Sequence, residues 1–151
     1  MILFLDFDGV LHTEGEGHLP DDGTNFCFLP RLEALLREFD GVRIVISSAW
    51  RERYSLERLR EFFSEDLQHR VIGVTPLPVR DPAGYVPARR EGEILAWLEE
   101  NGGTQQPWVA LDDADWQFDR YLNRLVACGS FIGFDEAAEL ALRNHLEGWA
   151  R

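Results

Sequence analysis

Short, continuous apolar runs alternate along the chain with longer segments in which apolar residues recur at helical spacing. The apolar runs predict five strands, at residues 2–5, 42–46, 71–74, 108–111 and 125–128. Helical spacing predicts helices around residues 29–39, 59–63 and 94–98, and a last helix that follows an N-cap at Asp135 and stops near Gly148. Such alternation is typical of a parallel sheet that helices cover on both faces.

We therefore expect an α/β fold, a three-layer, doubly wound and Rossmann-like parallel sheet of about five strands. No internal repeat, low-complexity tract or linker divides the sequence, so residues 1–151 are expected to form a single domain. Two loops are long: residues 12–25 are rich in glycine and acidic residues, and residues 75–89 are rich in proline.

Charge and composition argue against several classes of protein. The net charge of −12 repels a phosphate backbone, so a nucleic-acid partner is possible but is not favoured. The two cysteines lie outside any zinc-ligand pattern, and no apolar segment approaches the roughly 18 residues that a membrane span needs. We expect a cytoplasmic protein without a membrane partner.

Acidic residues and serines follow three of the predicted strands. They are Asp6 and Asp8 after the first strand, Ser47 and Ser48 after the second, and Asp112 and Asp113 after the fourth. In an open α/β sheet these strand ends meet at one edge, where ligands bind. Each close pair of carboxylates there costs on the order of 4 kcal/mol at an effective dielectric of 20. A bound cation removes that cost, and ligands that offer only oxygen indicate Mg²⁺.

The order of these groups resembles a known family. DFDGV after the first strand, SSAWR after the second, RREGEILAWL in a later helix and DD after the fourth strand are similar to the haloacid dehalogenase-like (HAD) superfamily, most members of which are phosphatases. The serine, arginine and DD segments resemble more narrowly a branch of small HAD domains, some of which are joined to RNA-repair modules. The resemblance covers nearly the whole chain.

The resemblance implies a Mg²⁺-dependent phosphohydrolase with a role for each aspartate. Asp6 would attack phosphorus to form an aspartyl phosphate, and Asp8 would act as general acid and then as general base. Asp112 would bind Mg²⁺ together with Asp6 and the main-chain carbonyl of Asp8. Asp113 would be a further ligand or would hold the waters of the metal.

The phosphoryl group needs a hydroxyl donor and a cation in this family. Ser47 is preferred as the donor, at the start of a helix, while Ser48 is either its rival or an N-cap. Because the relevant segment lacks lysine, Arg90 is preferred as the cation and Arg89 is close behind. The alternative is that both arginines are solvated charges at the start of the helix.

The spacing of the motifs leaves no room for a cap domain, the insertion that sets specificity in many HAD enzymes. Capless members often act on large substrates or use a partner as a lid, so the phosphorylated substrate is of unknown size and a partner acting as a lid is possible. A nucleic-acid end would need a basic strip, for which the candidates are Arg51, Arg53, Arg58 and Arg60; the alternative is a solvated helix face. Two other functions remain: a receiver-like signalling domain, and a non-catalytic module that binds phosphate or metal.

Five other residues carry weaker expectations. Trp50 and Arg51 could wall or clamp a substrate, although packing is the simpler interpretation of the tryptophan. His12 is expected to be solvated in the long acidic loop, as is His18 in the same loop. Cys27 precedes an apolar helix and is expected to be a small buried hydrophobic residue.

Overall fold

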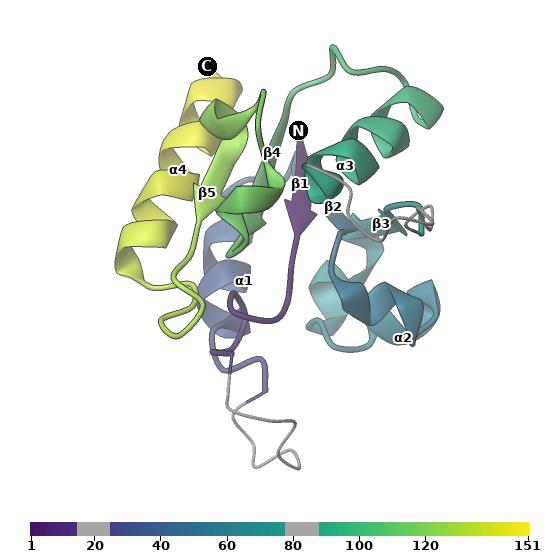
Figure 1. Cartoon of the computed structure of the whole chain (residues 1–151). Coiled ribbons are helices and arrows are strands. Elements are labelled where there is room, and N and C mark those ends of the chain that lie inside the picture. The colour runs from purple at the N-terminus through teal and green to yellow at the C-terminus, as the bar shows by residue number, and fades with distance from the viewer. Residues whose placement is uncertain (15–24, 78–87) are drawn as a thin grey trace.

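A computed structural model describes residues 1–14, 25–77 and 88–151, and these residues form a sheet of five parallel strands (Figure 1). The strands are β1 (Ile2–Leu5), β2 (Arg43–Ile46), β3 (Val71–Val74), β4 (Trp108–Asp112) and β5 (Leu125–Ala127). Their order across the sheet is β3-β2-β1-β4-β5, and every neighbouring pair is parallel. The predicted Rossmann-like α/β fold is confirmed.

The described residues also form four α-helices and several short 3₁₀ helices, which lie between the strands except for α4, which follows β5. The α-helices are α1 (Leu29–Arg37), α2 (Leu56–Arg60), α3 (Arg89–Glu100) and α4 (Glu136–Ala150), and the 3₁₀ helices are η1 (Ala49–Glu52), η2 (Glu65–Arg70), η3 (Asp115–Gln117) and η4 (Leu122–Arg124). Helix α3 lies apart from α1 and α4, which contact each other (Figure 1). The described residues contain no cap domain, as expected.

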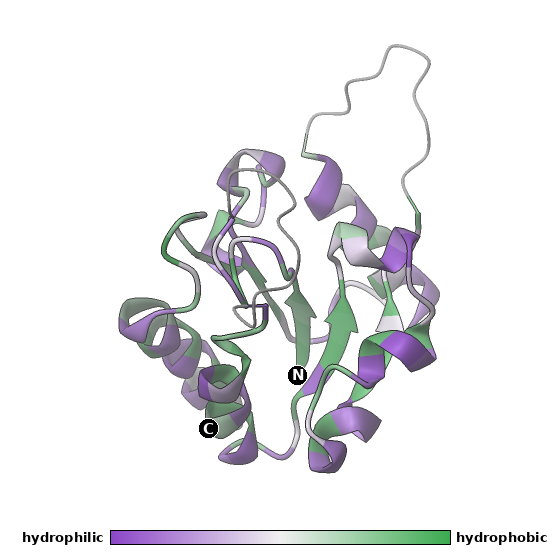
Figure 2. Ribbon diagram, turned by 90° about the horizontal axis from the view of Figure 1, so that it is seen from below, coloured by the Kyte–Doolittle hydropathy of each residue, from purple (hydrophilic) through white to green (hydrophobic). Residues whose placement is uncertain are grey.

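The central strand β1 divides its side chains between two hydrophobic clusters. Leu3 and Leu5 belong to the larger cluster, which includes the apolar faces of α1 and α4, while Ile2 and Phe4 belong to the cluster that contains α3. Successive side chains of a strand point to opposite faces, so both faces of the sheet are buried. Figure 2 shows the apolar strands in green, and helices that alternate between purple and green.

Helix α4 ends at Ala150, close to the predicted stop near Gly148. Trp149 lies in these last residues, and its ring packs on the larger core cluster and directly over Gly41, where any side chain would collide with the indole. One expectation about packing needs correction. Cys27 was expected to be buried but is exposed, because it lies in the turn before α1 rather than on the apolar face of the helix.

The second cysteine, Cys128, follows β5 and is buried. Burial raises the pKa of its thiol to about 12, so the thiol is an inert apolar group at neutral pH. Among the described residues, no helix is long and apolar enough to span a membrane.

The N-cap of α4 gives a test of the fold. Asp135 accepts a hydrogen bond from the Ala138 amide at 2.9 Å, as its position in the sequence predicts. Asp135→Ala is expected to lower the free energy of unfolding by about 1 kcal/mol, measured by urea denaturation. Asn144→Ala, an exposed change in the middle of the same helix, is the control and is expected to change it by less than about 0.5 kcal/mol.

Candidate active site

Two aspartates lie at the ends of the neighbouring strands β1 and β4, where the order of the strands reverses direction. Asp6 directly follows β1, and its amide donates to the Leu111 carbonyl of β4 at 3.0 Å. Asp112 is the last residue of β4. The chain places β2 and β3 on one side of β1, and β4 and β5 on the other, so Asp6 and Asp112 flank the position where open α/β sheets bind ligands.

Three carboxylates gather at this position. Asp6, Asp112 and Asp113 each offer an oxygen, and these oxygens all lie within 4.8 Å of one another. Asp6 is 5% exposed and Asp112 is 1% exposed. Burial, and then the charge of Asp112, raise the pKa of Asp6 well above its usual range, although Arg90 acts in the opposite direction. Burial also raises the pKa of Asp112.

One arginine partly neutralises the cluster. Arg90 Nη1 lies 3.0 Å from Asp112 Oδ2 and 3.3 Å from Asp6 Oδ1, and its side chain is largely buried. Burial alone would lower the pKa of this guanidinium, but Asp112 and Asp6 raise it. Arg89, its neighbour on α3, is exposed and pairs with Glu93 at 3.2 Å. Of the two candidates in the sequence, the structure therefore places Arg90 against the aspartates.

Gly9 and Ser130 determine where Asp113 lies. Gly9 has a φ of 74°, which favours glycine, and a side chain built there would collide with the Asp113 carboxylate. Asp113 Oδ2 accepts a hydrogen bond from Ser130 Oγ at 2.8 Å. The glycine of the DFDG motif therefore allows the first loop to approach the second acidic motif closely.

Asp8 lies outside the three-carboxylate cluster. Its side chain is 44% exposed, whereas that of Asp6 is 8% exposed. Asp8 Oδ1 accepts hydrogen bonds from His12 Nε2 at 2.8 Å and from Trp50 Nε1 at 3.0 Å. The DxD spacing thus separates a buried aspartate from one that faces outward.

His12 is the residue that sequence reasoning missed. It was expected to be solvated, but it is only 7% exposed and binds Asp8. His12 is buried because the Phe28 amide donates a hydrogen bond to the Leu11 carbonyl at 2.9 Å, which holds the start of the long loop against the site. The DxDGxxH spacing was the available signal, since a residue four positions after Asp8 can return to it. His18 lies outside the described residues.

The two serines are both buried, but among the described residues only Ser48 has a side-chain hydrogen bond that explains its position. Ser48 Oγ accepts from the Trp50 amide at 3.2 Å and caps η1, as one of the alternatives proposed. Ser47, 1% exposed, directly follows β2, and its amide donates to the Leu5 carbonyl. The helix expected here is only the four-residue η1, so an extended helix dipole does not face the site.

Arg51 is a structural residue rather than part of a basic strip. Its side chain is 3% exposed, and all five of its N–H donors are used. The acceptors are the carbonyls of Ser47, Ser48, Thr75 and Pro76 and the carboxylate of Glu93. Arg51 thereby joins the serine loop to the end of β3 and to α3.

The other three candidates for a basic strip have different surroundings. Arg60 donates to the Val71 carbonyl at 2.8 Å, and Arg58 pairs with Glu61. Arg53 is exposed. The four arginines were candidates for one basic strip, with a solvated helix face as the alternative, but the irregular path through η1 and the short α2 turns Arg51 inward.

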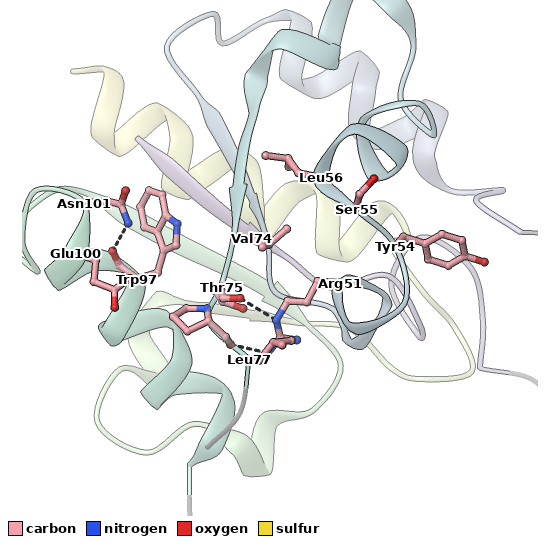
Figure 3. Close-up of a pocket in the computed structure, with 11 residues that line it drawn as sticks. Arg51, Tyr54, Ser55, Leu56, Val74, Thr75, Leu77, Trp97, Glu100 and Asn101 are labelled. Carbon is pink, nitrogen blue, oxygen red and sulfur yellow. Dashed lines mark hydrogen bonds between the residues drawn. The ribbon is translucent and has the colours of Figure 1, made fainter. Parts of the chain in front are cut away.

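A separate cleft of about 460 Å³ lies beside β3. Figure 3 shows Arg51, Thr75 and Trp97 among the residues around it, and Asn101 bonded to Trp97. Thr75 Oγ1 is buried and has no hydrogen-bond partner among the described residues. Asp6, Asp112 and Asp113 are not among the described residues that line this cleft, so it is distinct from the acidic site.

Comparison with known proteins identifies the family of this chain. Residues 2–138 match the model of a family described as the HAD domain in Swiss Army Knife RNA repair proteins. The chain belongs to this family. The searches of curated proteins and of solved structures each found no match. The predicted resemblance to a small HAD domain is confirmed.

The donor set of this HAD domain fits a divalent cation. The cluster offers three carboxylates, and one guanidinium contacts two of them, so negative charge is in excess. Its ligand atoms are all oxygens, which suits Mg²⁺ better than a metal that prefers nitrogen or sulfur.

The raised pKa of Asp6 predicts how stability depends on pH without metal. A carboxyl group whose pKa is higher in the folded protein binds more protons there, so its stabilising effect is present at low pH and is lost as the pH rises through the folded pKa. In EDTA, the Tm is expected to fall as the pH rises above the ordinary pKa of an aspartate and through the raised pKa of Asp6. Asp6→Asn should make the decline shallower, as measured by differential scanning calorimetry; an equal or steeper decline would contradict this account.

Proposed function

We propose that this protein is a Mg²⁺-dependent phosphohydrolase that acts through an aspartyl phosphate on Asp6. The observation that carries the proposal is the pairing of a buried Asp6, beside Arg90 and two further carboxylates, with an outward-facing Asp8 two residues later. Two carboxylates in different environments can take different roles in one reaction. Membership in the HAD family supports a hydrolase.

The reaction has two steps on these residues. The Asp6 carboxylate attacks phosphorus, the bond to the leaving oxygen breaks, and Asp8 gives its proton to that oxygen. Asp8, now ionised, then takes a proton from the water that attacks the aspartyl phosphate. Phosphate leaves, the Asp6 carboxylate is restored, and Asp8 is protonated again for the next turnover.

Binding of the phosphoryl group falls to the residues around Asp6. Arg90 lies beside the nucleophile and would neutralise the charge of the transferring group, with Ser47 as the hydroxyl donor and Ser48 as the cap of η1. Asp6, the main-chain carbonyl of Asp8, Asp112 and Asp113 would hold Mg²⁺ directly or through its waters. When bound, the metal supplies positive charge that lets Asp6 approach an anionic substrate.

A receiver-like signalling domain is disfavoured by the sheet. Receivers have the strand order 2-1-3-4-5, whereas this sheet has the order β3-β2-β1-β4-β5. Asp8 also supplies the acid and base that would make a phosphorylated Asp6 short-lived. A phosphoenzyme that persisted for minutes would favour the signalling function.

We further propose that the phosphorylated substrate is the end of an RNA strand. The family description names RNA repair proteins, which supports this class. The net charge of −12 opposes binding of a long strand by this chain alone. A partner that supplies basic surface and acts as a lid would remove that obstacle.

Metal binding can be measured without turnover. At a Mg²⁺ concentration about ten times its Kd, the Tm is expected to rise by about 3–5 °C, because the ion binds only the folded site. Asp112→Asn should abolish most of this rise, while Asp115→Asn, an exposed change three residues away, should leave it intact. Equal rises in all three proteins would contradict the metal assignment.

Activity gives the second test. Phosphate release from p-nitrophenyl phosphate should require Mg²⁺, stop in EDTA, and fall at least about a thousandfold in Asp6→Asn. The adjacent arginines form a matched pair: Arg90→Ala should lower kcat/KM by about a hundredfold, and Arg89→Ala by less than about threefold.

The same assay separates the alternatives. Release that persists in Asp6→Asn would refute the proposed mechanism. Faster release from a phosphorylated oligoribonucleotide than from p-nitrophenyl phosphate would support an RNA end as the substrate, and the reverse order would favour a small ester. A folded protein that binds Mg²⁺ but releases no phosphate from either substrate would favour a non-catalytic module.

A further inference from the structure

We propose that His12 and Trp50 are positioning residues that hold the Asp8 carboxyl group in the orientation needed to protonate the leaving group. The inference rests on the proposed phosphohydrolase activity. Neither residue would touch the phosphoryl group, since both act through Asp8.

Both residues donate to the same atom. His12 Nε2 lies 2.8 Å and Trp50 Nε1 3.0 Å from Asp8 Oδ1. Two donors on one oxygen restrict the rotation of the carboxyl plane. Because Oδ1 already accepts two N–H bonds, Oδ2 is the oxygen that carries the transferable proton.

The His12 ring is itself fixed in one tautomer. Its Nδ1 accepts the Phe26 amide at 3.2 Å, so the proton of the ring is on Nε2 and is donated to Asp8. Phe26 has a φ of 61°, a backbone conformation that residues other than glycine rarely adopt. The fold thus keeps a costly conformation at the residue that orients the histidine.

Trp50 is fixed by its aromatic neighbours. Its ring centroid lies between 5.2 and 5.9 Å from those of five other rings: Phe7, His12, Phe26, Tyr54 and Phe62. The sequence left open whether Trp50 packs or serves the site, and the structure shows it packing while its indole N–H reaches Asp8. The packing of the Trp50 ring therefore orients its indole N–H group toward Asp8.

Loss of this arrangement has a specific kinetic signature. A leaving group that is a strong acid departs without a proton, whereas a weakly acidic one needs the proton from Asp8 as the P–O bond breaks. p-Nitrophenyl phosphate and phenyl phosphate are similar in shape, but phenol is a much weaker acid than p-nitrophenol. A misaligned Asp8 should therefore slow the hydrolysis of phenyl phosphate much more than the hydrolysis of p-nitrophenyl phosphate.

The experiment measures kcat/KM for both esters in Trp50→Phe and His12→Leu, with Asp8→Asn as the reference for loss of the acid. In each positioning variant, kcat/KM should fall at least about tenfold for phenyl phosphate and less than about threefold for p-nitrophenyl phosphate. Asp8→Asn should show the same preference for the ester with the more acidic leaving group. His12→Gln, which keeps an N–H donor, should recover part of the loss on phenyl phosphate. In the Asp8→Asn background, Trp50→Phe should add little further loss.

The outcomes are distinguishable. Equal losses on both esters would mean that the two residues only support the fold, and unchanged rates would mean that Asp8 needs no help; either result overturns the positioning role. A wild-type protein that hydrolyses neither ester would overturn the proposed function and this inference with it. Melting temperatures identify any variant that fails to fold, and the ratio of the two rates remains valid where folding is only partial.

Discussion

The structure depends on concentrating negative charge at the end of its central strand. Asp6, Asp112 and Asp113 bring their oxygens within 4.8 Å of one another, with Arg90 as the cation that contacts two of them. Such a cluster is unfavourable where water is excluded, because burial penalises each ionised carboxylate. It persists because strands β1 and β4 are rigidly paired beneath it, and their ends cannot separate without breaking the sheet.

The same constraint explains why the two aspartates of the DxD motif differ. The turn that begins at Phe7 carries Asp8 out of the buried cluster, and the N–H bonds of His12 and Trp50 hold it there. One short loop therefore provides a desolvated carboxylate and a hydrated one. Their different surroundings, rather than their chemical identity, allow one to act as nucleophile and the other as acid and base in the proposed reaction.

Most of the fold could be predicted from the chain, because buried parallel strands are short apolar runs and amphipathic helices have a clear period. The gathering of Asp6, Asp112 and Asp113 follows from the rule that parallel strands end at one edge. The sequence favoured Arg90 only narrowly over Arg89, since the choice depends on the rotation of α3 about its axis. The burial of His12 and the exposure of Cys27 depend on contacts between residues 11–12 and 26–28, which leave no periodic signal in the sequence.

Arg51 has a consequence for how substitutions near the site are interpreted. All five of its donors are bound to neighbouring acceptors, which leaves it no N–H for a phosphate unless the scaffold rearranges. An alanine scan that ranked arginines by lost turnover would place Arg51 beside Arg90, although removing the first would disconnect the serine loop, β3 and α3. Turnover alone is therefore an unreliable guide to ligands in this protein, and a folding measurement has to accompany each arginine variant.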